Sequence, residues 1–144
     1  MIDTYYSDSI PFHLTTREFV ELARSRLAPG GVIVMNVIGA IAGDGSHLFR
    51  ALYRTYRTSF PTVVVHPVGT LREVITNLIL LATDRPAPSK AVLAARWRAV
   101  RRRTPSAPDL GVAIRDRVDS FIPTADVPTL TDDYAPTDAL LFLE

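Results

Sequence analysis

The residues best suited to chemistry are two aspartates near the N-terminus, Asp3 and Asp8. Ile2-Asp3 has the pattern of the last residues of a strand, and a loop from Thr4 to Pro11 follows at once. Ligands of open α/β sheets bind beyond the carboxyl ends of the strands, so Asp3 is expected at such a place. A carboxylate there can accept a proton from an amine or hold a cationic amine. An aspartate after a strand is also common in ordinary loops, so both interpretations stay open.

Two helices and a strand must position this loop. Thr15 and Glu18 have the spacing of a capping box, which predicts a helix that runs on to Leu27. Residues 32–38 are a nearly continuous apolar run, which is typical of a strand buried on both faces. Ser46 can cap the next helix, in which Arg50 is expected to lie off the apolar face.

Two further strands are predicted at residues 62–65 and 74–82. Residues 66–73 between them are too few for a crossover helix, so these strands should be antiparallel neighbours. Asn36 and Asn77 are amides inside apolar strands, so each is either structural or faces a ligand. Helices are expected at 89–103 and 109–121, ahead of a loop-like end. The order predicts the back half of a doubly wound α/β sheet with an antiparallel final hairpin.

Several motifs together resemble a known family. They are Leu-Thr-Thr-Arg-Glu-Phe at residues 14–19, Leu-Ala-Pro-Gly-Gly-Val at 27–32, Asn-Leu-Ile-Leu-Leu-Ala-Thr at 77–83, and Leu-Thr-Asp-Asp-Tyr-Ala-Pro at 130–136. With Asp3 and its loop, they make the chain resemble the spermidine synthase (polyamine aminopropyltransferase) family, in particular its bacterial spermidine synthase-like branch. The resemblance covers about residues 1–83 and 128–142. It implies the C-terminal half of a Rossmann-like, class I methyltransferase-type sheet over residues 1–84, with a helical and proline-rich extension of the same domain over 85–144.

The resemblance also implies an activity and a set of site residues. The family transfers an aminopropyl group from decarboxylated S-adenosylmethionine to a diamine such as putrescine. By position, Asp3 takes the role of the base that deprotonates the attacking amine, and Asp8 and Tyr5 are substrate-binding candidates. Asp133 and Tyr134 are candidates for closing the amine pocket from the tail. The family's short Asp-x-x-Asp-Pro motif is replaced here by a longer spacer between Asp3 and Asp8.

The nucleotide-binding part of the family's pattern has no counterpart here. The family's glycine-rich loop and its ribose-binding acidic residue precede everything in this sequence, and Gly39, Gly43 and Gly45 do not have the Gly-x-Gly-x-x-Gly spacing. We therefore expect that this fragment binds no cofactor and is inactive, although decarboxylated S-adenosylmethionine is the co-substrate of the full-length family.

Composition narrows the class of protein. The net charge of +1 gives no sign of nucleic-acid binding, and the absence of cysteine excludes disulfides and thiolate chemistry. No apolar run is long enough for a membrane span, and the N-terminus does not resemble a secretory signal, so a cytoplasmic protein is expected. Three scattered histidines predict no metal site.

Two other functions fit the same pattern. The chain could be a relative of the S-adenosylmethionine-dependent methyltransferases, in which case the amine-binding carboxylates would have no purpose. It could also be a non-catalytic remnant that dimerises, because an exposed sheet edge can pair with another chain. A homodimer is the expected assembly.

Overall fold

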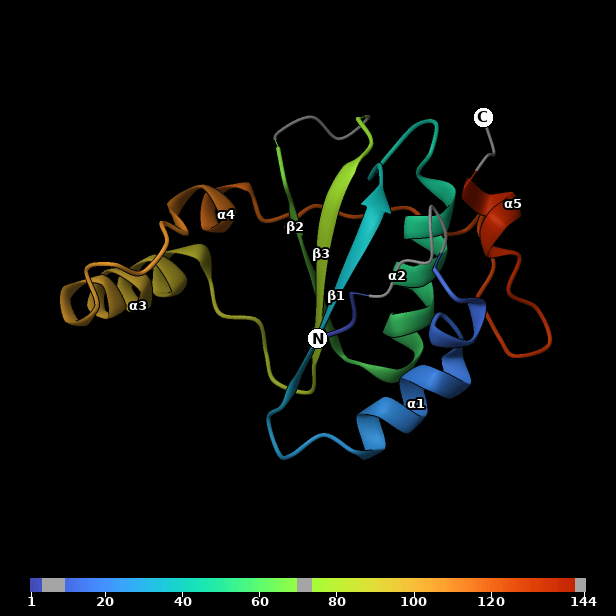
Figure 1. The fold of residues 1–144 in the computed structure, drawn as a ribbon, viewed down its shortest axis with the longest axis horizontal. Coiled ribbons are helices and arrows are strands. Elements are labelled where there is room, and N and C mark those ends of the chain that lie inside the picture. Colours follow the sequence, from blue (N-terminus) through green and yellow to red (C-terminus); the bar gives the residue numbers. More distant parts are fainter. Residues whose placement is uncertain (4–9, 70–73, 142–144) are drawn as a thin grey trace.

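The computed structural model describes residues 1–3, 10–69 and 74–141, arranged around one small sheet (Figure 1). Tyr5 and Asp8 lie outside these residues. The described elements are the 3₁₀ helix η1 (Phe12–Leu14), α1 (Arg17–Ser25), β1 (Val32–Gly39), α2 (His47–Ser59), β2 (Thr62–Pro67), β3 (Thr76–Thr83), α3 (Lys90–Arg103), α4 (Gly111–Asp116) and α5 (Thr137–Leu141). None of the described helices is long and apolar enough to cross a membrane.

The sheet has three strands in the order β1-β3-β2, and β3 is antiparallel to both neighbours. Residues 32–38 and 74–82 therefore lie side by side, and the predicted antiparallel hairpin of the last two strands is confirmed. β1 and β2 run parallel to each other with β3 between them, and α2 connects them. On the free edge of β1, Ile2 forms a parallel bridge with Met35.

One face of the sheet is covered by helices and carries the core. Figure 1 shows α1, α2 and α5 together on one side of the strands. Met35, Val37, Leu78 and Leu80 point to this side and are at most 1% exposed. Each such side chain contributes roughly 1.5–3 kcal/mol through burial. This face is therefore the main source of the fold's stability.

The opposite face of the sheet is only partly covered. Burial alternates along β1, and Val32 and Ile38 on this second face remain 45% and 42% exposed. The prediction that this strand is buried on both faces is therefore wrong for the described chain. The reason is that α3 and α4 form an arm that projects away from the sheet, on the side opposite α2 (Figure 1).

The start of α1 differs by one residue from the prediction. The Thr16 hydroxyl, and not that of Thr15, accepts a hydrogen bond from the Phe19 amide at 3.2 Å and caps the helix. Thr15 closes η1 instead, because its hydroxyl donates to the Phe12 carbonyl oxygen. A second threonine follows the first in this sequence, so spacing alone could not choose between them.

Two expectations for α2 are wrong for a common reason. Arg50 is only 7% exposed, and its guanidinium forms an ion pair with Asp126 at 2.6 Å. The Ser46 hydroxyl does not cap the helix; it accepts a hydrogen bond from Arg50 Nε at 3.0 Å. The tail crosses α2 here, and Arg54 also donates to two of its carbonyl oxygens. The contacts with the tail join residues 70 to 76 positions apart, which local periodicity cannot detect.

Candidate functional site

Asp3 lies beside β1 and immediately after the residue that pairs with it. The Ile2 amide donates to the Val34 carbonyl oxygen at 2.7 Å, and the Asn36 amide donates to the Ile2 carbonyl oxygen at 3.0 Å. These two bonds fix the direction of the chain as it enters Asp3. The Asp3 side chain is exposed, and its Oδ1 accepts a hydrogen bond from Asn36 Nδ2 at 3.0 Å.

Asn36 explains why an amide stands in the middle of an apolar strand. Its side chain lies on the sheet face away from the core, where it orients the Asp3 carboxylate. Its Oδ1 is buried and has no hydrogen-bond partner within the described part of the chain. An unpaired buried acceptor lowers the stability of the fold by about 1–3 kcal/mol, so a hydrogen-bond donor that reaches this oxygen would bind favourably. The sequence had left open whether Asn36 is structural, and its partner is the candidate base itself.

The Asp3 carboxylate is not part of an ion pair among the described residues. Among residues 1–3, 10–69 and 74–141, Asp3 has no ion-pair partner, and its hydrogen bond comes from a neutral amide. A carboxylate that is held in place without a neutralising cation can bind an ammonium group or accept its proton. Of the predicted site residues, Tyr5 and Asp8 fall outside the described part, so their relation to Asp3 rests on the sequence alone.

The tail residues Asp133 and Tyr134 lie in a tight turn against the start of α1. Thr131 and Tyr134 exchange two backbone hydrogen bonds, and Tyr134 is 59% exposed. The Asp132 amide donates to Glu18 Oε2 at 3.1 Å, which docks the turn on the helix. The turn that contains Asp133 and Tyr134 is thus hydrogen-bonded to α1, whereas Asp3 is hydrogen-bonded to β1. These bonds do not join the predicted tail residues to Asp3.

A depression with two carboxylates forms where this turn meets α1. It has a volume of about 420 Å³ and is lined by Phe12, His13, Glu18, Phe19, Leu22 and Asp132. Hydrogen bonds from the backbone amide of Glu18 itself, from Arg17 and from the Asp132 amide hold the pKa of the Glu18 carboxyl below its usual value. Aromatic rings beside carboxylates suit an organic cation. The sequence pattern indicated Glu18 only as part of a helix cap, so this depression was not predicted.

Metal binding finds no support in the described chain. Residues 1–3, 10–69 and 74–141 contain no group of three or more His, Asp or Glu side chains that could hold a metal ion. His66 uses Nδ1 in a 2.8 Å hydrogen bond with the Ala113 carbonyl oxygen, which ties α4 to β2. This histidine therefore has a structural contact on a part of the sheet remote in sequence from Asp3.

Comparison with known proteins agrees with the resemblance found in the motifs. No family model matches the sequence. A stretch of 46 residues, 32% of this chain, is 41% identical to a probable polyamine aminopropyl transferase of Bifidobacterium longum (strain NCC 2705). The chain is similar to a polyamine aminopropyl transferase. The matched stretch spans only 10% of that relative's length.

A solved structure supports the same fold. The chain resembles the crystal structure of a probable spermidine synthase from Corynebacterium glutamicum ATCC 13032, with a TM-score of 0.55 and 23% identity. The match covers 69% of this chain and 36% of that one. Sequence and fold thus both support the spermidine synthase resemblance, and this chain spans about a third of its solved relative.

Proposed function

We propose that this chain carries the amine-binding side of a polyamine aminopropyltransferase, with Asp3 as the base. The observation that carries the proposal is the Asp3 carboxylate, which Asn36 orients at 3.0 Å and which no cation neutralises among the described residues. The similarity to a probable polyamine aminopropyl transferase supports an amine as the substrate of this carboxylate. The proposed reaction is therefore the transfer of an alkyl group to an amine.

The reaction needs a base because an ammonium group is not a nucleophile. In the proposed step, Asp3 takes a proton from one ammonium group of putrescine. The freed nitrogen lone pair attacks the propyl carbon next to the sulfonium of decarboxylated S-adenosylmethionine. The new C–N bond forms as the C–S bond breaks, and the sulfur leaves as the neutral thioether methylthioadenosine. Asn36 acts by positioning the Asp3 carboxylate toward the amine.

The far end of the diamine needs a second partner, which can be a carboxylate or the hydroxyl of a tyrosine. Asp8 and Tyr5 are proposed for this from the loop after Asp3, and Asp133 and Tyr134 from the tail. Glu18 and Asp132 add a carboxylate-lined depression between Phe12 and Phe19. A diamine carries a charge at each end, so two separated acidic places suit it better than one.

The remaining parts of the proposal concern the enzyme as a whole. The strand order β1-β3-β2 with Ile2 parallel to β1 supports the C-terminal half of a Rossmann-like sheet. The glycine-rich loop that would bind the nucleotide has no counterpart in the sequence. We therefore propose that this chain alone does not turn over, that it belongs to polyamine synthesis, and that it forms a homodimer.

The test separates amine binding from catalysis. Putrescine is titrated into the ¹⁵N-labelled chain, and the side-chain amide signal of Asn36 is followed by NMR. We expect this signal to shift, and we expect Asp3→Asn to abolish the shift while Asp138→Asn, an exposed aspartate on α5, leaves it intact. An unchanged shift in Asp3→Asn would contradict the assignment of Asp3.

Turnover is measured in parallel with two adenosyl donors. The chain is incubated with putrescine and either decarboxylated or ordinary S-adenosylmethionine, and the thioether products are separated by chromatography. We expect no product from the chain alone. Formation of S-adenosylhomocysteine from the ordinary donor would instead support the methyltransferase interpretation.

A further inference from the structure

The centre of the open face of the sheet is apolar, although no helix of the described chain lies flat on it. Paired residues on this face include Val34 with Leu81 and Val64 with the same Leu81 across β3. Val32 and Ile38 are 45% and 42% exposed. An apolar strip on a sheet is typical of a surface that another element covers. Polar residues share this face, among them Asn36 and Thr83, so only the strip has the composition of a buried layer.

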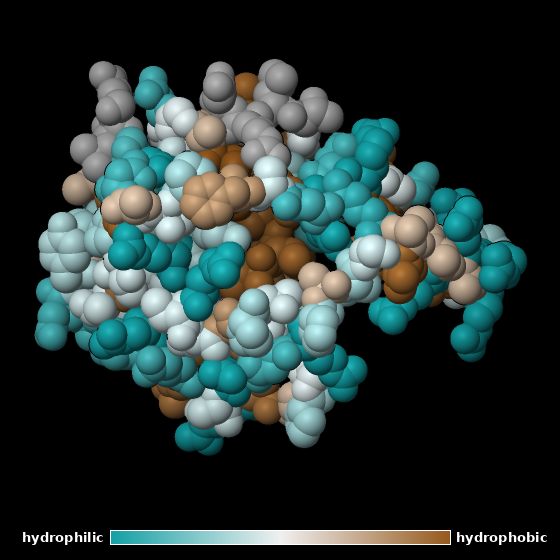
Figure 2. Space-filling model, turned by 180° about the vertical axis from the view of Figure 1, so that it is seen from behind, coloured by the Kyte–Doolittle hydropathy of each residue, from teal (hydrophilic) through white to brown (hydrophobic). Residues whose placement is uncertain are grey.

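The arm formed by α3 and α4 turns part of this face into a groove. One part, of about 370 Å³, has Val32, Val64 and Leu81 along it, and the adjoining part, of about 410 Å³, adds Ile79 and Trp97. Both parts share Leu81 with three further residues, so they are continuous. Seen from behind, apolar surface lies in a hollow beside the arm (Figure 2).

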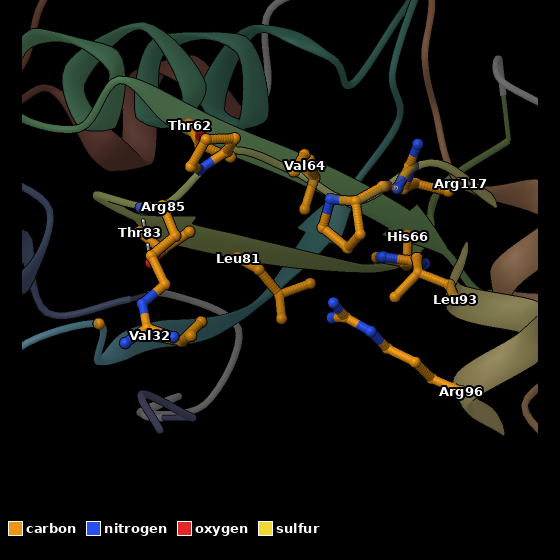
Figure 3. Close-up of a pocket in the computed structure, with 14 residues that line it drawn as sticks. Val32, Thr62, Val64, His66, Leu81, Thr83, Arg85, Leu93, Arg96 and Arg117 are labelled. Atoms are coloured by element: carbon orange, nitrogen blue, oxygen red, sulfur yellow. Dashed lines mark hydrogen bonds between the residues drawn. The ribbon is translucent and has the colours of Figure 1, made fainter. Parts of the chain in front are cut away.

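The charge of the groove has one sign. Its lining contains Arg85, Arg96 and Arg117 and no carboxylate. Arg117 is paired with Asp119 at 2.7 Å, whereas Arg85 and Arg96 have no ion-pair partner in the described part of the chain. Figure 3 shows these two side chains reaching over the floor from opposite sides, Arg85 near Val32 and Arg96 toward Leu81.

We propose that the groove is the docking site of an acidic amphipathic helix from a polypeptide outside this sequence. The apolar stripe of such a helix would cover Val32, Val64 and Leu81, as a second layer covers an α/β sheet. Acidic residues on its flanks would pair with Arg85 and Arg96, since neither guanidinium has an ion-pair partner among the residues that the structure describes and both lie at the edges of an apolar floor.

The docking site is independent of the proposed amine chemistry. Asp3 and Asn36 do not line the groove, whose residues come from the opposite end of β1, from β2, β3 and the arm. Loss of Asp3 should therefore leave helix binding unchanged, and loss of the groove arginines should leave the Asn36 response to putrescine unchanged.

Trp97 provides the measurement, because it lines the groove and is the single tryptophan of the chain. The probe is a designed peptide of about 20 residues with a leucine stripe at helical spacing and glutamates on both flanks. Its counterpart carries lysines in place of the glutamates. We expect Trp97 fluorescence to change on addition of the acidic peptide, with about tenfold tighter binding than for the basic peptide at low salt.

Charge reversal within the groove makes the test specific. The double variant Arg85→Glu with Arg96→Glu should invert the preference, so that the basic peptide binds more tightly. The matched control is Arg101→Glu with Arg102→Glu, which makes the same change on α3 outside the groove lining. All four side chains are exposed, so circular dichroism and the urea midpoint should show that both variants fold.

Three results would overturn the proposal. The first is equal binding of the two peptides, or equal loss in the control variant, because the groove arginines would then select nothing. The second is a Trp97 response to decanoate without a response to the peptide, which would mean a small amphiphile as occupant. The third is a change of Trp97 fluorescence with protein concentration in the absence of peptide, which would mean that a second copy of the chain occupies the groove.

Discussion

Leu80 and Leu81 are neighbours on β3, yet they belong to two surfaces with different roles. Leu80 is completely buried under the helices, whereas Leu81 is half-buried at the floor of the groove. The covered face closes the core of the described chain. The open face carries an apolar strip beside polar residues and, instead of a helix layer, two arginines without an ion-pair partner among the described residues. Apolar composition thus measures a tendency to be covered, which the helices of the described chain satisfy on one face only.

The largest expected effect is on the covered face. Leu80→Ala should lower the free energy of unfolding by about 2–5 kcal/mol, because it removes a fully buried side chain and leaves a cavity. Leu81→Ala should cost about half as much or less, since water already reaches part of that side chain. Urea unfolding of both variants measures the difference. Equal losses would mean that the open face is covered in solution.

A smaller effect is expected from the cap of α1, which belongs to the helix layer of the covered face. Thr16→Ala removes the acceptor of the Phe19 amide and should lower the free energy of unfolding by about 1 kcal/mol. Thr16→Ser keeps the hydroxyl and should lose much less. The same urea titration compares them, and an alanine variant as stable as the wild type would contradict the assignment of the cap to Thr16.

The stability of the protein should depend on pH through the ion pair between Arg50 on α2 and Asp126 in the tail. The hydrogen bond from Arg50, followed by a backbone amide, holds the pKa of the Asp126 carboxyl below its usual value. A carboxyl whose pKa is lowered by folding stabilises the protein above its unfolded pKa and loses that contribution as the pH falls toward its folded pKa. The urea midpoint should therefore decrease below about pH 4.

Asp126→Asn is the control for this dependence. The variant should be less stable than the wild type at neutral pH, and the two should converge in acid. Parallel curves for the two proteins over the whole range would show that the ion pair with Arg50 contributes nothing to the fold.

The smallest effect is expected at the edge of the open face. Val32→Thr changes a side chain that is 45% exposed, so the free energy of unfolding should stay within about 0.5 kcal/mol of the wild type. Val37→Thr, the same change at 0% exposure on the covered face, should cost about 1–3 kcal/mol. Thermal unfolding is sufficient for this pair. A large loss of unfolding free energy in Val32→Thr would mean that this side chain is covered in solution.

Local pattern was sufficient for much of the fold. The strand at residues 32–38, the hairpin of β2 and β3, and the helix that became α3 followed from apolar runs and connection length. These features depend on the near neighbours of each residue. The cap at Thr16 was missed by one position because Thr15 offers the same chemistry, and only the turn of η1 separates the two.

The contacts around the proposed site residues could be predicted only in part. Asp3 was singled out by its place after Ile2, and the parallel bridge of Ile2 with Met35 agrees with that placement. Its partner Asn36 stands 33 positions away, and Glu18 meets Asp132 across 114 positions. Such pairs have no periodicity in the sequence, because nothing but the folded chain brings them within hydrogen-bond distance.

The order of the amino acids predicts which residues prefer to be buried, since alternation and apolar runs act over a few neighbours along the chain. It also carries the resemblance on which the proposed substrate class of Asp3 depends. Which face of the sheet is covered follows only from the folded chain, because it depends on where α2 and the arm lie in space (Figure 1). The same holds for the buried Arg50, whose partner Asp126 arrives from a tail remote in sequence and makes burial of its charge possible.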